Sequence, residues 1–476
     1  MELEKDLRSR QEVRNLVENA YKAQACLCQM GQEKIDAMVK SMSQMGQKHA
    51  AELASLAAQE TGFGNAKDKT IKNEFASRTL YEAIKDQKTV GFLRENRERK
   101  VWDVAVPVGV IAGIVPSTNP TSTVIYKAMI SIKAGNAIVF SPHPGAKECT
   151  IRAAQLMEQA ILDAGGPKWA VSCISEPTMD AVDELMKHPK ISLILATGGS
   201  AMVRAAYSSG TPAIGVGAGN GPAYLHHSCN LTKAVQAIVR SKTFDNGTVC
   251  ASEQSIIVER SMANQAEEEL VRQGCRILTE DESKKLASIL FRANGTMSPK
   301  IVGKTADQIA QMAGLGTVGA KVLVARERGA GMEYPYSHEK LCPVLGLYEV
   351  ENEEEALELS CKILHHEGSG HTFCIHAEEE TVIRRFALHV PVSRFLVNTP
   401  GSLGGIGATT NLFPALTLGC GAVGGSSSSN NIGPMDLINI RRVAWGHKQT
   451  QEAHTTVMAD DHLVELLTKK LLEKLM

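Results

Sequence analysis

Residues 1–90 carry apolar side chains at helical spacing among many charges. Two such stripes are Val13, Leu16, Ala20 and Ala23, and then Ile35, Met38, Val39, Met42 and Met45. Apolar positions three and four residues apart lie on one face of a helix, which can pack against a core. This region therefore predicts two or three helices.

From Trp102 the pattern changes to short β-branched runs that end in Gly, Pro or Asn. These runs occupy residues 101–116, 136–140, 169–174, 191–199 and 212–219. Helical segments separate them at Thr123–Lys133, Lys147–Ala164 and Met179–Lys187. Strands that alternate with helices are typical of a parallel sheet with crossover helices. Residues 1–230 are thus expected to form a doubly wound α/β domain.

A second alternating region begins with the helical stretch Leu231–Lys242. Strand-like runs follow at residues 255–259, 321–327, 343–350 and 394–398. They predict a second α/β domain over residues 231–430, with one more short strand within residues 431–445.

The end of the chain has a different character. Residues 446–457 are polar and typical of a linker. Residues 458–476 predict an amphipathic helix, because one face would carry Val464, Leu467, Leu471 and Leu475.

Length and charge exclude several functional classes. The chain has 476 residues, too many for one hydrophobic core of roughly 250–300 residues. Lys and Arg total 51 against 52 Asp and Glu, so no positive field exists to bind nucleic acid. The longest uncharged apolar stretch, Val104–Pro116, is shorter than the roughly 20 residues of a spanning helix, so no membrane association is expected. The amino terminus lacks an apolar signal core, which predicts a reducing, cytoplasmic location.

The sequence does not predict a metal site. Its 11 cysteines include no C-x-x-C pair. His338-Glu339 lacks the second histidine of a metalloprotease helix, and two glycines interrupt the segment between His366 and His371.

Cys250 is the candidate nucleophile. It follows an Asn-Gly turn within the segment Phe244–Ser252 and precedes the strand-like run 255–259. A thiol on a loop between domains can be exposed and oriented for attack. Position alone would still favour a structural cysteine.

The surroundings of Cys250 resemble the aldehyde dehydrogenase superfamily, whose catalytic cysteine follows a Phe-x-Asn-x-Gly-type segment. The resemblance extends from about residue 15 to residue 445. It implies an aldehyde dehydrogenase fold, with a Rossmann-like cofactor domain, an α/β catalytic domain and a small oligomerisation hairpin near residues 95–108. The strand within residues 431–445 would join that hairpin in an oligomeric sheet, which implies a homodimer or homotetramer.

The resemblance also implies catalytic residues. Ile114–Pro120 resembles the family's Pro-x-Asn-Phe-Pro segment, whose Asn amide helps form the oxyanion hole, so Asn119 is expected there. Lys127 matches the family's helical lysine, and its role stays open between function and a structural position. His371 would assist proton movement at the thiol, or it is a histidine with a structural hydrogen bond.

The same resemblance implies NAD as the cofactor, with NADP left open. Residues 134–142 resemble the strand that ends at the adenosine ribose, and residues 196–200 match the turn beside the pyrophosphate, where helix amides favour an anion. His338–Val344 corresponds to the family's Glu-x-Phe-Gly-Pro, which places Glu339 at the nicotinamide ribose. The expected cofactor residues are Pro116, Ser117, Thr118, Ser141, Pro142, His143, Thr197, Gly198, Gly199, Ser200, Gly217, Glu339 and Leu341.

One departure from the family indicates the reaction. Hydrolytic members carry Glu-Leu-Gly-Gly where this chain has Val216-Gly217-Ala218-Gly219-Asn220, so the glutamate that activates water is missing. The strings NPTSTVIYK, FDNGTVCASEQS, GHTFC and LTLGCG resemble the branch that releases the acyl group to coenzyme A, including enzymes of bacterial microcompartments. A standalone enzyme is implied that reversibly converts a short-chain aldehyde, NAD and coenzyme A to acyl-CoA and NADH through a cysteine thiohemiacetal and thioester.

The amphipathic segment 458–476 resembles the encapsulation helices that bind microcompartment shell proteins. The alternative is that it packs on its own oligomer. The expected location is therefore the cytoplasm, either free or inside a microcompartment.

Two other functions stay open. An acyl-phosphate reductase of the glutamyl phosphate type shares the fold and lacks the same glutamate, and dependence on coenzyme A separates it. A non-catalytic scaffold protein is the second, and the intact Cys250 and Asn119 argue against it. The identity of the aldehyde cannot be read from the sequence.

Overall fold

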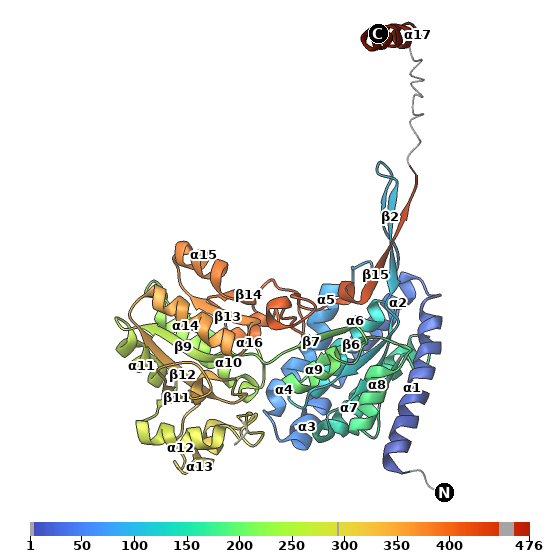
Figure 1. The fold of residues 1–476 in the computed structure, drawn as a ribbon. Helices are drawn as coiled ribbons and strands as arrows, with labels where there is room; N and C mark the ends of the chain where they lie inside the picture. Colours follow the sequence, from blue (N-terminus) through green and yellow to red (C-terminus); the bar gives the residue numbers. More distant parts are fainter. Residues whose placement is uncertain (1–3, 293–294, 447–460) are drawn as a thin grey trace. The chain divides into compact units, whose positions relative to one another are not determined.

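A computed structural model describes residues 4–292, 295–446 and 461–476. The chain forms two compact units, one of Met1–Gly91 with Ala105–Asn439 and one of Phe92–Val104 with Ile440–Met476. The larger unit contains two parallel sheets, each covered by helices (Figure 1).

The first sheet has five parallel strands in the order β5-β4-β3-β6-β7. They are β3 (Val110–Ile114), β4 (Ala137–Ser141), β5 (Val171–Cys173), β6 (Ile191–Thr197) and β7 (Ala213–Val216). Chain order runs outward in both directions from β3 and β6. The sheet therefore has a topological switch point between these two strands, where α/β sheets usually bind ligands.

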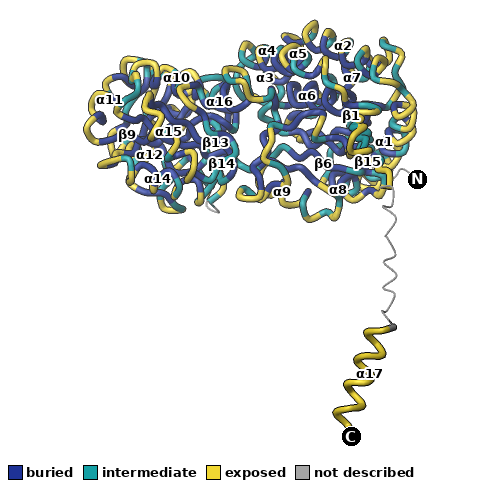
Figure 2. Tube along the Cα trace, turned by 90° about the horizontal axis from the view of Figure 1, so that it is seen from above, coloured by how far each residue is buried: buried dark blue, intermediate teal, exposed yellow. Residues whose placement is uncertain are grey.

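Helices cover both faces of this sheet. One face packs against α1 (Lys5–Leu27), α8 (Met179–Lys187) and α9 (Ser200–Tyr207). The other packs against α2 (Gln32–Lys48), α6 (Pro120–Lys133) and α7 (Lys147–Asp163), and α6 is buried along its whole length (Figure 2). Beside α6 and α7 lie α3 (Ala50–Thr61), α4 (Ala66–Glu74), the π-helical turn η1 (Phe75–Thr79) and α5 (Leu80–Ile84).

The second sheet has seven parallel strands in the order β10-β11-β12-β9-β8-β13-β14. They are β8 (Gly221–Leu225), β9 (Glu253–Glu259), β10 (Cys275–Ile277), β11 (Val322–Arg326), β12 (Val344–Val350), β13 (Gly370–His376) and β14 (Val392–Val397). Because side chains alternate along a strand, Ile256 and Val258 pack on one face and Ile257 on the other. Both faces of the sheet are therefore apolar and need cover.

Helices supply that cover. α10 (Leu231–Thr243) and α11 (Ala263–Arg272) pack on one face, and α14 (Glu353–His366) and α15 (Glu380–His389) pack on the other. α12 (Glu280–Leu290) and α13 (Ala306–Met312) share a further core with β11 and β12, and α16 (Gly401–Gly405) lies beside α10. No helix of the described ranges is both long and apolar enough to cross a membrane.

The smaller unit holds most of a three-stranded sheet in the order β1-β2-β15. Its strands are β1 (Gly91–Asn96), β2 (Val101–Pro107) and β15 (Ile438–Ala444). The Trp102 ring contacts Phe92 and Trp445 at centroid distances of 5.5 and 4.5 Å, which ties the strands together. Helix α17 (Asp461–Leu475) is coloured as exposed in Figure 2, and its leucine side chains are exposed.

The expected α/β fold with parallel sheets is confirmed, and the structure moves one boundary. Strand β8 lies within the range 1–230 expected for the first domain, yet it hydrogen-bonds to β9 and β13 of the second sheet. The chain therefore changes sheet between β7 and β8. The hairpin near residues 95–108 is found as β1 and β2, and the short strand of residues 431–445 is β15. The predicted linker at 446–457 lies almost wholly outside the described residues.

Candidate functional site

Cys250 lies on the loop between α10 and β9, a loop that turns sharply. Asp245, Asn246 and Gly247 have φ values of 47°, 53° and 76°, all in the left-handed region. Asn, Asp and Gly are the residues that adopt this conformation at least cost, which explains the Asp-Asn-Gly sequence. The turn brings the half-buried Cys250 to the amino end of β9.

Gly219, from another segment, lies against the Cys250 backbone. A Cβ at Gly219 would lie 1.9 Å from the Cys250 carbonyl oxygen and 3.2 Å from His371 Cε1, so only glycine fits. The Gly219 N–H donates to Glu339 Oε1 at 2.9 Å. Three loops therefore meet at Cys250, and each precedes a strand of the second sheet.

The environment keeps Cys250 protonated. Burial raises the pKa of its thiol to about 12, with Glu339 and Cys420 acting in the same direction and Arg394 opposing them. The cofactor-free protein therefore holds a thiol rather than a thiolate at neutral pH.

His371 is the second residue of β13 and is fully buried. Its Nδ1 contacts Thr372 Oγ1 at 2.9 Å, while Nε2 is buried without a hydrogen-bond partner among the described residues. Burial lowers the pKa of the imidazole to about 3, and the nearby Arg394 lowers it further. The ring is neutral at pH 7, with one nitrogen unused beside Gly219.

Asn119 connects the first sheet to the nucleophile loop. It follows β3 and occupies the N-cap position of α6 without a side-chain capping hydrogen bond. Its Nδ2 donates to Thr248 O at 3.4 Å, two residues before Cys250, and to Thr118 Oγ1 at 3.1 Å. Its Oδ1 accepts a short hydrogen bond from Lys72 Nζ. The amide N–H2 therefore faces the loop that carries the thiol.

Most of the expected cofactor residues lie at one edge of the first sheet. Pro116, Ser117 and Thr118 follow β3, Thr197 ends β6 with Gly198, Gly199 and Ser200 after it, and Gly217 follows β7. The first two groups flank the switch point. Gly199 precedes α9 and offers no side-chain cap, so the amino end of that helix is suited to bind an anion. This edge fits a dinucleotide.

Two expected residues are less accessible. Ser141 and Pro142, at the end of β4, are buried, whereas His143 is exposed and its Nδ1 accepts from the Gly145 N–H at 3.0 Å. Of this group His143 alone presents a side chain to the surface. Leu341 is half-buried before β12, and its N–H lies 3.5 Å from Met297 Sδ.

Glu339 and Lys127 differ in burial and in their partners. Glu339 is half-buried, and its pKa is raised to about 8 by burial and by Glu367. Lys127 is fully buried and donates to the carbonyls of Ile114 and Leu195, both at 2.8 Å, which joins β3 to β6 at the switch point. This geometry gives Lys127 a structural role.

Sequence reasoning missed the residues that support the site. They are Lys69 and Lys72 on α4, Asp245 before the thiol, Gly219, and Arg394 on β14. Arg394 donates to Gly370 O at 3.2 Å and to Gly419 O at 2.6 Å. These two hydrogen bonds connect the loop that contains Gly419 to the start of β13. The lysine spacing could not reveal burial, because exposed helices carry lysines at the same spacing.

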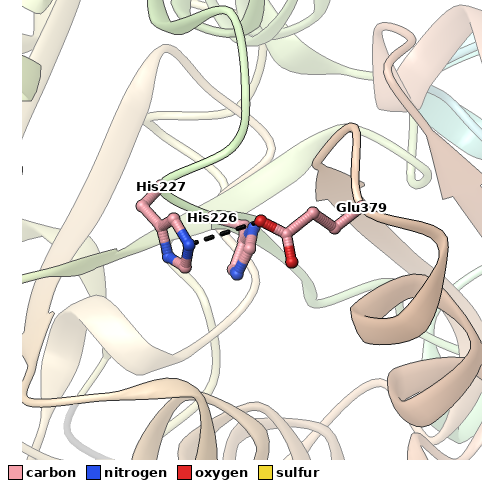
Figure 3. Close-up of side chains that lie close together, drawn as sticks. All are labelled: His226, His227 and Glu379. Atoms are coloured by element: carbon pink, nitrogen blue, oxygen red, sulfur yellow. Dashed lines mark ion pairs between the residues drawn. The ribbon is translucent and has the colours of Figure 1, made fainter.

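One group among the described residues has the composition of a metal site. His226, His227 and Glu379 have ligand atoms within 4.8 Å of one another (Figure 3). Both His226 nitrogens already have protein partners, because Nδ1 contacts Ser228 Oγ at 2.8 Å and Nε2 contacts Glu353 Oε1 at 3.2 Å. Hydrogen bonds account for this group, and we assign no metal to it. The absence of a metal site stays a prediction.

Comparison with known proteins agrees with this architecture. The profile of the aldehyde dehydrogenase family matches residues 5–405. An acetylating aldehyde dehydrogenase from Geobacillus thermoglucosidasius is 52% identical, with 93% of this chain and 98% of that chain covered and a TM-score of 0.92. A propionaldehyde dehydrogenase from a Clostridium phytofermentans fucose-utilisation microcompartment is 27% identical, with 91% and 97% covered and a TM-score of 0.83.

Curated relatives include longer proteins. The bifunctional aldehyde-alcohol dehydrogenase of Escherichia coli K12 is 43% identical over 439 residues, which is 91% of this chain and 49% of the relative. The chain thus spans about half the length of the first curated relatives it matches.

The raised pKa of Cys250 predicts its reactivity. In the cofactor-free protein, the alkylation rate of Cys250 by iodoacetamide should rise about tenfold per pH unit from pH 7 to 10, because the thiolate fraction does so below the pKa. Glutathione in the same solution should level off near an ordinary thiol pKa of about 8.5. Mass spectrometry of the Cys250 peptide measures the rate, and a plateau below pH 8 would contradict the buried-thiol description.

Proposed function

We propose that this chain, which belongs to the aldehyde dehydrogenase family, oxidises a short-chain aldehyde with NAD and passes the acyl group from Cys250 to coenzyme A. The observation that carries this proposal is the meeting of Cys250, Gly219 and His371 beside Asn119, at a sheet edge that fits a dinucleotide. The acetylating relative from Geobacillus thermoglucosidasius supports the acyl-CoA product.

The protein side chains supply most of the chemistry. Cys250 sulfur adds to the aldehyde carbonyl, and the unused Nε2 of His371 accepts the thiol proton. The alkoxide of the thiohemiacetal accepts hydrogen bonds from the Asn119 amide and the Cys250 backbone N–H. Each such donor is worth about 3 kcal/mol in a buried site.

Residues around the first sheet hold the dinucleotide. The α9 amino terminus with Thr197–Ser200 would hold its pyrophosphate, and Glu339, before β12 of the second sheet, would bind its nicotinamide ribose. Bound NAD supplies the hydride acceptor. His143 is the side chain best exposed to distinguish a 2′-hydroxyl from a 2′-phosphate, so the choice between NAD and NADP depends on that edge.

The acyl acceptor is coenzyme A rather than water because the segment beside Cys250 lacks a base. Val216–Asn220 contains no carboxylate side chain. The carboxylate of Glu339 accepts a hydrogen bond from the Gly219 N–H. The Cys250 thioester therefore persists until the thiol of coenzyme A attacks it. Since one thioester replaces another, the step is reversible.

The smaller unit has a separate proposed role. The sheet β1-β2-β15 joins copies of the chain in a homodimer or homotetramer. Helix α17 exposes Leu463, Val464, Leu467 and Leu471 by 52–62%, which leaves an apolar face for a partner. The partner we propose is a microcompartment shell protein, and the Clostridium phytofermentans relative supports a setting inside a microcompartment.

Replacing Cys250 tests the covalent step. Cys250→Ala should abolish both acyl-CoA formation and the enzyme-bound thioester, because no other thiol would serve as nucleophile. The thermal unfolding midpoint and the dissociation constant for NAD should stay close to the parent values. Residual turnover above a few per cent would overturn the assignment.

Omitting coenzyme A tests the acceptor. Without it, NADH should form in a burst of about one equivalent per site and then stop, because the thioester is not hydrolysed. Product analysis should find little carboxylate. Steady hydrolysis would show that another group activates water, and Glu339, whose charge acts on Cys250, would be the first to test. A requirement for phosphate instead of coenzyme A would favour an acyl-phosphate reductase.

Removing the tail tests the role of α17. Deletion of residues 447–476 should leave kcat unchanged and abolish co-purification with shell proteins, because every residue assigned to the reaction lies between residues 116 and 371. Size-exclusion chromatography serves as the control for assembly. Loss of the oligomer or of activity would assign the helix to the enzyme itself.

A further inference from the structure

Lys72 lies beneath the proposed oxyanion site and has no role assigned so far. It belongs to α4, is fully buried, and sends its Nζ to three acceptors. Two are short hydrogen bonds to Asn119 Oδ1 and Asp245 Oδ2, and the third goes to Thr248 Oγ1 at 3.2 Å. One ammonium thus contacts both the segment that carries Asn119 and the loop that carries Cys250.

This contact determines which way the Asn119 amide points. An ammonium has donors only, so it can face the amide oxygen and not the amide N–H2. With Oδ1 held by Lys72, Nδ2 must face the opposite side, where it donates to Thr118 Oγ1 at 3.1 Å and to Thr248 O at 3.4 Å. A flipped amide would place N–H2 against the ammonium and would lose all three contacts.

The charge of Lys72 also affects the strength of the amide as a donor. A cation at Oδ1 polarises the amide and makes its N–H a better donor, an effect that is larger in a buried site of low dielectric. The Asp245 carboxylate offsets the cost of burying that charge. Its Oδ2 accepts hydrogen bonds from Lys72 Nζ and, at 2.9 Å, from Lys69 Nζ.

We propose that Lys72 is a positioning residue for catalysis, which orients and polarises the Asn119 amide toward the alkoxide formed on Cys250. This inference rests on the proposed function, because it assumes that Asn119 stabilises that alkoxide. Lys72 itself touches neither substrate nor cofactor and acts through Asn119.

Lys69 provides a matched control. It lies one helical turn away on the same helix, is equally buried, and shares Asp245 as its ion-pair partner. Its other contact is the backbone carbonyl of Thr118 at 2.9 Å, so it does not touch the Asn119 side chain. Lys69→Met and Lys72→Met remove the same charge from the same cluster, and only the second releases the amide.

The test measures kcat/KM for acyl-CoA formation in full-length Lys72→Met, Lys69→Met, Asn119→Ala and the Lys72→Met/Asn119→Ala double variant. Asn119→Ala should lower kcat/KM roughly 10²- to 10³-fold, the usual effect of losing an oxyanion donor. Lys72→Met should lower it about 10- to 100-fold, and Lys69→Met by far less. In the Asn119→Ala background, Lys72→Met should cause little further loss, because its effect passes through the missing amide.

A second measurement separates positioning from damage to the loop. Alkylation of Cys250 by iodoacetamide displaces iodide and forms no alkoxide, so it reports on the thiol without the oxyanion site. Lys72→Met should leave this rate within about twofold of the parent while kcat/KM falls. Lys72→Gln keeps a donor for Oδ1 and should recover part of the loss, and it carries the test if Lys72→Met does not fold.

The outcomes distinguish the two proposals. The positioning role would be overturned if Lys72→Met lowered kcat/KM by the same factor in the parent and in the Asn119→Ala background. It would also be overturned if the alkylation rate of Cys250 fell in parallel with kcat/KM. Either result would leave the proposed function intact. An Asn119→Ala variant with full activity would overturn the role of Asn119 in the proposed function and the inference with it.

Discussion

The buried carboxylate of Asp245 is the interaction on which the site depends. It accepts hydrogen bonds from the Asn65 N–H at 2.8 Å, from Thr248 Oγ1 at 2.8 Å, and from the ammonium groups of Lys69 and Lys72. Burial alone would raise its pKa, yet the two lysines hold the pKa below its ordinary value. Breaking one partner of such a buried pair costs about 3–5 kcal/mol, so the turn before Cys250 and helix α4 are stable only together.

The two sheets explain why the proposed cofactor and nucleophile residues come from different parts of the sequence. Cofactor residues follow strands of the first sheet, because the ends of parallel strands at a switch point form a crevice. Cys250, Gly219 and His371 instead lie at or before the amino ends of strands in the second sheet. One edge holds helix amino termini that suit phosphate, and the other holds buried loops that suit a protected thiol.

Strands with a continuous apolar pattern could be predicted from the sequence, whereas residues that act through tertiary contacts could not. Periodicity located β4, β6, β9 and β12, because buried parallel strands are continuous apolar runs. It missed β8, whose residues Gly221–Leu225 include a glycine and a proline, and this displaced the boundary to residue 230. The candidates Cys250 and Asn119 came from motif resemblance. Lys72 could not be found, since only the fold places a lysine of a charged helix beneath an amide 47 residues away.

Burial keeps the Cys250 thiol and the His371 imidazole uncharged in the free protein. The thiol of Cys250, with its pKa raised to about 12, and the imidazole of His371, with its pKa lowered to about 3, are both neutral at pH 7. The neutral thiol oxidises less readily than a thiolate, and neither neutral group attracts water as strongly as a charge would. Charge then develops only when an aldehyde accepts the sulfur, and the Asn119 N–H2 already faces the nucleophile loop through its hydrogen bond to Thr248 O. Preorganised donors of this kind act without reorganisation during the reaction, which makes their orientation by neighbouring side chains as important as their presence.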